Sequence, residues 1–343
     1  MVLTQTLSSP YLLKQKLPLS HSQQQKIFHF RQEAIHLLKG QDRIALIIGP
    51  CSIHNYEAAL NYGQKLKKMI DLVKDTCFIV MRTYIEKPRT TLGWKGFLYQ
   101  PNLYEEPDIE QGLFLTRKLF LELTDLSIPL AMEFVDPLSA YYFDDLITWG
   151  AIGARTSSSQ THRQIASYLP FPMGFKNTID GNIDIPIQAM VAAASPQTFF
   201  GISEEGQISS LTSKGNPWTH LILRGSEDKT NYDVFSLRRA FEKETAYGIS
   251  PPILIDCSHG NSKKKISKQK EIFLEILEKK LDPSIPLLGI MLESFLKEGH
   301  QEVSLSTPFD THLSITDPCL GWETTEQLIR WAHESLSKKP IRL

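Results

Sequence analysis

The sequence predicts an α/β protein: a (β/α)8 TIM barrel with an N-terminal extension and an extra β-hairpin before the sixth strand. Two observations predict it. Short apolar runs of strand length alternate with stretches of helical periodicity, and eight such pairs are the number that closes a barrel. Polar side chains also follow every predicted strand, where barrel active sites form. A doubly wound open sheet is the alternative, but the sequence has no G-x-G-x-x-G turn typical of that fold.

The repeating elements run through most of the chain. The expected strands are 43–49, 77–83, 129–134, 150–154, 171–175, 219–224, 252–257 and 286–292. The expected helices that follow them are 56–74, 108–126, 138–149, 160–168, 184–195, 232–247, 263–279 and 323–337.

Three segments depart from this repeat. Residues 1–40 precede the catalytic barrel of 41–343 and are expected to form an arm and a helix at 22–39. Residues 197–218 are predicted to form the inserted hairpin. Residues 293–322 form a long connection before the last helix, and loops of that length are usually functional or disordered.

Composition narrows the class of protein. The chain has 343 residues, of which 41% are hydrophobic, and its 37 Lys and Arg nearly balance 38 Asp and Glu. Such a balance gives no bulk attraction to nucleic acid or anionic lipid, so neither is expected as a partner. The longest apolar runs fall far short of the roughly 20 residues that span a bilayer. Four scattered cysteines indicate reduced thiols, and we expect a cytoplasmic protein with no leader segment.

A set of cationic side chains gathers after the strands. Arg and Lys at these positions would repel one another unless they bound anions, and arginine suits phosphate and carboxylate. Six cations indicate at least two phosphates and a carboxylate, although a single arginine at a strand end is more often paired with a neighbouring acid. The six are Arg82, Lys87, Arg89, Arg155, Lys176 and Arg224.

A second set combines a thiol, an imidazole and two carboxylates. A mixed shell of this kind suits Mn²⁺, Fe²⁺, Co²⁺ or Zn²⁺ and suits Mg²⁺ poorly. The spacing matches no standard metal motif, and a lone cysteine after a strand is more often a small buried residue. The prediction of a metal site therefore depends on the position of its candidate ligands at the same rim of the barrel. Its candidate ligands are Cys51, His259, Glu293 and Asp317.

Several motifs together resemble the class-I 3-deoxy-D-arabino-heptulosonate 7-phosphate (DAHP) synthases, the bacterial and fungal type that opens the shikimate pathway to aromatic amino acids. The likeness covers almost the whole chain from about residue 20. The motifs are GPCSIHN (49–55), EKPRTTLGWKG (86–96), WGAIGARTSSSQTHR (149–163), GFKN (174–177), HLILRG (220–225), IDCSHGNS (255–262), GIMLES (289–294) and SITDPCLGWE (314–323).

The resemblance implies a barrel that condenses phosphoenolpyruvate with D-erythrose 4-phosphate and water. This pair of substrates carries the two phosphates and one carboxylate that the cations indicate. By motif, Arg155, Arg224 and the backbone at Ala154 would hold the phosphate of phosphoenolpyruvate. Arg89 and Thr90 would hold the phosphate of the sugar.

The remaining roles also come from the resemblance. Arg82, Lys87 and Lys176 would face the carboxylate of phosphoenolpyruvate, and Lys87 could protonate the nascent alkoxide. Glu133 could position the attacking water or a cation, and His259 is counted with the catalytic groups as well as with the ligands. The resemblance implies one divalent metal ion per subunit and, since relatives are dimers or tetramers, a homodimer or homotetramer.

Two other functions stay open. A sister synthase makes 3-deoxy-octulosonate 8-phosphate from arabinose 5-phosphate, but that group has K-A-N-R-S where this chain has Lys87–Pro88–Arg89–Thr90. A non-catalytic barrel that senses sugar phosphates would tolerate loss of Lys87 or of a metal ligand, and none is lost. The basic run at 263–270 is interpreted as the solvated face of a helix.

Overall fold

A computed structural model describes residues 4–40, 43–280, 282, 285–303 and 308–337. Parts of the predicted arm (1–3), of the start of the barrel segment (41–42), of the long connection (304–307) and of the C-terminal end (338–343) lie outside the described residues. No helix among the described residues is both long enough and apolar enough to cross a bilayer.

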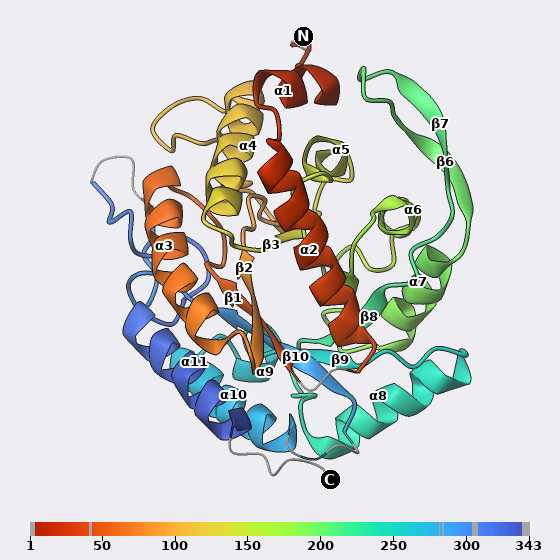
Figure 1. The fold of residues 1–343 in the computed structure, drawn as a ribbon, viewed down its shortest axis with the longest axis vertical. Helices are drawn as coiled ribbons and strands as arrows, with labels where there is room; N and C mark the ends of the chain where they lie inside the picture. The colour runs from red at the N-terminus through yellow and green to blue at the C-terminus, as the bar shows by residue number, and fades with distance from the viewer. Residues whose placement is uncertain (1–3, 41–42, 281, 283–284, 304–307, 338–343) are drawn as a thin grey trace.

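Eight parallel strands close into a barrel, which confirms the predicted fold (Figure 1). Their order around the barrel is β1-β10-β9-β8-β5-β4-β3-β2. The strands are β1 (Ile44–Gly49), β2 (Cys77–Arg82), β3 (Leu130–Glu133), β4 (Trp149–Ile152), β5 (Met173–Lys176), β8 (Thr219–Leu223), β9 (Ile253–Asp256) and β10 (Leu287–Glu293). The first and last residues of each strand lie within three residues of the ends predicted for it.

Each barrel strand is followed by one helix, except β9, which is followed by two. Among the described residues the helices are α1 (Pro10–Lys16), α2 (His21–Leu38), α3 (Tyr56–Val73), α4 (Ile109–Asp125), α5 (Ser139–Phe143), α6 (Gln160–Tyr168), α7 (Asp184–Ala194), α8 (Val234–Ala246), α9 (His259–Ser262), α10 (Ile266–Lys280) and α11 (Trp322–Ser337).

The prediction of a helix over 138–149 is wrong in length. Helix α5 ends at Phe143 because the chain must reach the sheet, where the backbone N–H of Thr148 already donates to the carbonyl of Leu130 at 2.9 Å. Strand β4 starts at Trp149, so its first residue had been counted as helix.

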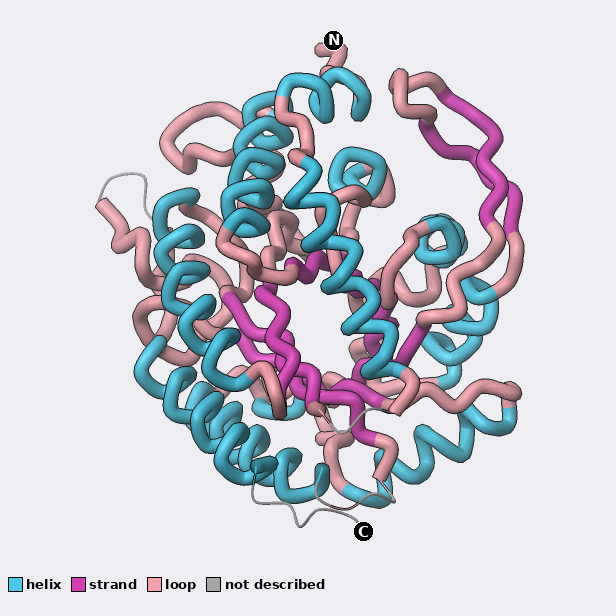
Figure 2. Tube along the Cα trace, in the orientation of Figure 1, coloured by secondary structure: helices cyan, strands magenta, loops and turns pink. Residues whose placement is uncertain are grey.

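The lumen of the barrel is divided into an apolar and a polar half. Side chains such as Val80, Trp149 and Ile222 fill the half near the strand beginnings and pack against Ala34 and Leu37 of α2. Figure 2 shows α2 lying across the barrel opening. A Ser20–Gln23 capping box starts this helix, each side chain pairing with the other residue's backbone N–H. The lumen is therefore closed at this end.

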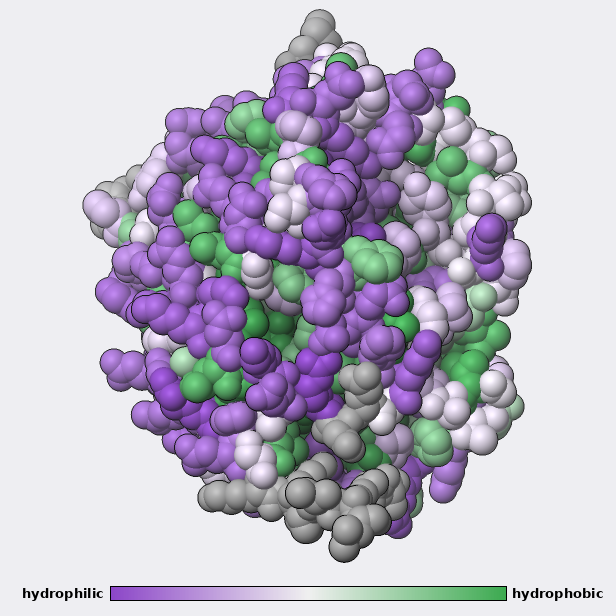
Figure 3. All heavy atoms as spheres, viewed as in Figure 1, coloured by the Kyte–Doolittle hydropathy of each residue, from purple (hydrophilic) through white to green (hydrophobic). Residues whose placement is uncertain are grey.

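The inserted hairpin consists of β6 (Gln197–Ile202) and β7 (Ile208–Ser213), as predicted. Because it precedes β8, it leaves the barrel at the end opposite the carboxyl rim. Its tip meets the arm, where the N–H of Tyr11 donates to the carbonyl of Glu204 at 2.8 Å. The surface in Figure 3 is mostly hydrophilic, but it is paler and greener over the hairpin.

Candidate active site

The charged residues at the strand ends point into the lumen because side chains alternate along a strand. Val80 is in the apolar half, so Arg82, two residues later on β2, faces the same interior one layer higher. The same step leads from Leu254 to Asp256 on β9. The apolar side chains in the lower half of the lumen thus fix the direction in which the charged side chains at the strand ends point.

A cleft of about 270 Å³ opens at this rim. It brings together every residue predicted for catalysis, substrate binding or metal binding. These are Cys51, Arg82, Lys87, Arg89, Thr90, Glu133, Ala154, Arg155, Lys176, Arg224, His259, Glu293 and Asp317.

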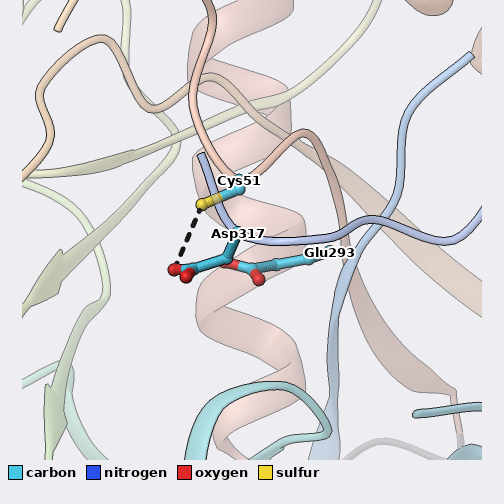
Figure 4. Close-up of side chains that lie close together, drawn as sticks. All are labelled: Cys51, Glu293 and Asp317. Atoms are coloured by element: carbon cyan, nitrogen blue, oxygen red, sulfur yellow. Dashed lines mark hydrogen bonds between the residues drawn. The ribbon is translucent and has the colours of Figure 1, made fainter. Parts of the chain in front are cut away.

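The thiol and the two carboxylates predicted as ligands converge from three separate segments (Figure 4). One donor atom from each of Cys51, Glu293 and Asp317 lies within 4.8 Å of the others. Burial, with a smaller effect of Glu293, raises the pKa of the Cys51 thiol to about 11, and the nearby Lys87 ammonium offsets this only in part. A cation of higher charge among these donors would favour the thiolate.

His259 lies beside this cluster. Its Nε2 is 3.8 Å from Oε1 of Glu293, and its Nδ1 is 2.9 Å from Oδ2 of Asp256. Burial alone would raise the pKa of the Asp256 carboxyl, but His259, Lys176 and Arg82 outweigh it and hold that pKa well below its usual range. An ionised Asp256 that faces Nδ1 leaves Nε2 directed towards the donor cluster.

Three of the six predicted cations are paired with acids inside the cleft. Arg82 Nη2 is 3.2 Å from Glu293, Lys87 Nζ is 2.8 Å from Asp317 Oδ2, and Lys176 Nζ is 2.9 Å from Glu133 Oε2. The Lys87 ammonium also lies 2.9 Å from the Cys51 sulfur. For these three, the salt-bridge alternative considered from the sequence describes the geometry.

The other three cations have no acidic partner within 4.0 Å among the described residues. Arg155 donates to the hydroxyl of Thr90 at 3.2 Å, and Arg89 Nε donates to the carbonyl of Trp94 at 2.8 Å. Burial, and to a lesser extent the charge of Arg155, lowers the pKa of the Arg224 guanidinium. An arginine whose charged state is disfavoured by burial and by a second arginine needs an anion to offset these effects.

This chain is similar to known proteins in both sequence and fold. A sequence model described as the DAHP synthetase I family matches residues 18–330. The chain belongs to the DAHP synthetase I family. The Tyr-sensitive phospho-2-dehydro-3-deoxyheptonate aldolase of Escherichia coli is 41% identical over 335 residues, which cover 97% of this chain and 94% of the relative. The Trp-sensitive enzyme of the same organism is 40% identical over 326 residues and covers 95% of this chain and 93% of its own length.

A solved structure shares the whole architecture. The phospho-2-dehydro-3-deoxyheptonate aldolase of Francisella tularensis superposes with a TM-score of 0.95 at 36% identity, over 98% of each chain. The resemblance predicted from the motifs is confirmed, and so is the family's barrel.

Sequence reasoning missed one group that lines the cleft of this DAHP synthetase I family member, Lys264, and one buried group beside His259, Asp256. Lys264 was placed on a solvated helix face, but α10 begins only at Ile266, and a left-handed backbone (φ +58°) accompanies its turn into the cleft. Its Nζ lies 2.7 Å from Oδ1 of Asp317. Asp256 was counted as the end of a strand, although its position two residues after Leu254 was enough to place it inside the barrel.

A second cavity of about 270 Å³ lies between the loop after β5 and α8. It contains none of the residues predicted for chemistry, and its Asp184 and Lys243 pair with each other. The cleft at the rim is therefore the candidate active site of this family member.

Proposed function

We propose that the protein is a metal-dependent DAHP synthase, which condenses phosphoenolpyruvate with D-erythrose 4-phosphate and water to give DAHP and phosphate. Membership of the family supports the reaction. The observation that carries the assignment of sites is the distribution of charge in the cleft. Arg155 and Arg224 have no acid within 4.0 Å among the described residues, whereas the Lys87 ammonium contacts the thiol of Cys51 and the carboxylate of Asp317.

The two phosphates are assigned to the cations that lack acidic partners. Arg155, Arg224 and the backbone at Ala154 would hold the phosphate of phosphoenolpyruvate, and Arg89 and Thr90 that of the sugar. The hydrogen bond from Arg155 to Thr90 supports adjacent subsites, since it joins the two groups of residues. Guanidinium forks suit phosphate oxygens in both.

The carboxylate of phosphoenolpyruvate is assigned to Arg82, Lys87 and Lys176. Two of these cations are neutralised by Glu293 and Asp317, which are also candidate metal ligands. A divalent ion shared by those acids would add two positive charges, so Arg82 and Lys87 would become available to an anionic substrate. This charge balance connects metal binding with substrate binding.

The residues present fit a single divalent metal ion. Cys51, Glu293 and Asp317 already hold their donor atoms close together, and His259 Nε2 would complete a mixed shell suited to Mn²⁺, Fe²⁺, Co²⁺ or Zn²⁺. When bound, such an ion supplies Lewis acidity that polarises the aldehyde carbonyl.

The protein's own groups move the protons. The enol carbon C3 attacks the aldehyde carbon, and the oxygen that gains the electron pair takes a proton from the Lys87 ammonium. Carbon C2 becomes electron-poor, water adds to it, and phosphate leaves. Lys176 outweighs the effect of burial and keeps the pKa of Glu133 below its ordinary value, so an ionised Glu133 can accept the proton of the water.

Phosphate release from phosphoenolpyruvate with each candidate aldose tests this function. Release with erythrose 4-phosphate, with little or none from arabinose 5-phosphate, is the expected result. The reverse preference would indicate the sister synthase, and no release with either sugar would indicate a sensing barrel. Lys87→Met is the matched control, since it removes the proposed proton donor with little change in volume.

We also propose a homodimer or homotetramer. One face of the hairpin carries Phe200 and Ile208, which are 87% and 85% exposed. Large apolar side chains that adjoin on a surface commonly mark a contact with another chain. A second copy of this chain would bury them.

A further inference from the structure

Glu86 is the only acid within the basic stretch from Arg82 to Lys95, yet it forms no ion pair. It is 1% exposed, and no cation among the described residues lies within 4.0 Å of its carboxyl group. Both Glu86 and Lys87 line the cleft, but the Lys87 ammonium contacts Cys51 and Asp317, whereas the Glu86 carboxyl group contacts the turn after β3 and the start of α5. It is therefore not the counter-ion that its place in the sequence suggests.

The hydrogen bonds around Glu86 constrain where its proton lies. The Ser139 hydroxyl is 2.7 Å from the Asp136 carbonyl and 2.8 Å from Glu86 Oε1. A hydroxyl has one proton, and a carbonyl oxygen can only accept. With an ionised Glu86, the single Ser139 proton can serve only one of these two acceptors. Both contacts can be hydrogen bonds only if Glu86 carries a proton and donates it to Ser139, which then donates to the Asp136 carbonyl. The other oxygen, Oε2, accepts the backbone N–H of Asp136 at 2.9 Å.

The surroundings favour the same protonation state. Burial raises the pKa of Glu86 to about 8, and the Asp136 charge raises it further. Burial outweighs the hydrogen bonds that the carboxylate form would accept from the Ser139 hydroxyl and from the backbone of Asp136 and Val135, which lower this pKa. The titratable groups that face it are Asp136, from the turn after β3, and Tyr99, whose hydroxyl lies 3.3 Å from Asp136 Oδ2. Lys87 is directed away from it, to Cys51 and Asp317.

The backbone around Glu86 forms the stem of the loop that carries Lys87, Arg89 and Thr90. The backbone N–H of Lys87 donates to the carbonyl of Lys95 at 2.8 Å, and the backbone N–H of Leu98 donates to the carbonyl of Ile85 at 3.1 Å. Gly96 has φ +120°, and a Cβ there would lie 2.6 Å from the Glu86 Cα. The two sides of the stem touch through their backbones, and the Glu86 side chain ties this stem to α5.

We infer that Glu86 is a positioning residue, held as a neutral carboxylic acid, which fixes the loop carrying Lys87 and Arg89. The inference rests on the proposed function, because Lys87 is the proton donor whose placement Glu86 controls. Glutamine can make the same two contacts, donating through its amide NH₂ to Ser139 and accepting through its oxygen from Asp136. Alanine can make neither.

Two substitutions separate the neutral acid from a carboxylate. We expect Glu86→Gln to keep kcat and both KM values near wild type at pH 7. Glu86→Ala is expected to lower kcat by about 10- to 100-fold with a smaller change in KM, because a misplaced catalytic group slows the chemical step. Above pH of about 8 the wild-type kcat should fall relative to that of Glu86→Gln, as Glu86 ionises. Glu244→Gln is the control, since Glu244 is a buried acid on α8, outside the cleft.

Infrared difference spectra provide a readout that needs no substrate, and so separate this inference from the proposed reaction. Wild type minus Glu86→Gln should show the carbonyl stretch of a protonated carboxylic acid at pH 7 and carboxylate bands at alkaline pH. Carboxylate bands at pH 7, or a Glu86→Gln enzyme as slow as Glu86→Ala, would overturn the neutral acid. Unchanged kcat in Glu86→Ala would overturn the positioning role. If that variant does not fold, Ser139→Ala, which removes one of the two contacts, takes its place.

Discussion

The assignment of the sugar-phosphate subsite can be tested with Arg89→Ala. Arg89 lies on the exposed part of the loop after β2, and its Nε is held by the Trp94 carbonyl. Both Nη groups therefore remain available for a phosphate at the mouth of the cleft. We expect KM for erythrose 4-phosphate to rise far more than KM for phosphoenolpyruvate.

The size of the effect follows from the kind of contact that is lost. A hydrogen bond to a charged group contributes about 1.5–3 kcal/mol, and about 1.4 kcal/mol corresponds to tenfold in binding. The range is therefore about 10- to 150-fold in KM if KM follows binding. Water and salt screen an exposed arginine, so the low end, about tenfold, is expected.

The assay is initial-rate phosphate release with one substrate varied while the other is saturating. Arg224→Ala is the matched control, because it removes the same side chain from a partly buried place beside Arg155. It should raise KM for phosphoenolpyruvate instead. Equal rises in both KM values for Arg89→Ala, or a rise confined to phosphoenolpyruvate, would show that the subsites are assigned wrongly.

Three further outcomes are expected. Chelation should abolish activity, and Mn²⁺ or Co²⁺ should restore it better than Mg²⁺, because the donor set includes a thiol. Full activity after exhaustive chelation would exclude a metal ion from the reaction. Burial raises the pKa of Glu244 to about 9, so its cost to folding grows above the unfolded pKa near 4.5 and reaches about 3 kcal/mol at pH 7. Denaturant unfolding should show Glu244→Gln more stable than wild type at pH 7 but not at pH 4, and an equal difference at both would contradict this. Light scattering should show a smaller oligomer for the double variant Phe200→Ser with Ile208→Ser. The control Phe28→Ser, at another exposed apolar site, should keep the wild-type mass. An unchanged mass in the double variant would place the contact between subunits elsewhere.

The strand ends were predictable because two local rules agree there. Apolar runs of four to seven residues gave the strands, and the alternation of side chains placed residues such as Arg82 and Glu293 on one rim. Motif resemblance then gave roles to these residues. Neither rule depends on knowing which strands are neighbours.

Pairing and protonation could not be predicted in this way. Arg82 meets Glu293 across more than two hundred residues, and only closure of the barrel brings them together. Lys264 looked like part of a solvated helix because its left-handed backbone is invisible in composition. Glu86 and Lys87 are neighbours in the sequence, but the sequence does not show that their charged groups point to different parts of the fold.

The helix across the barrel opening has a consequence for how this molecule can change. With α2 sealing one end, the substrates of the rim cleft have only the mouth at the carboxyl ends for entry and departure. On β2 and β9, one residue packs in the apolar layer and the residue two positions later is polar, as Val80 and Arg82 show. Replacing the apolar residue changes the stability of the barrel, and replacing the polar residue changes which ligand the cleft can bind. New specificity can therefore be sought in the uppermost lumen layer and its loops, without disturbing the layer that supports them.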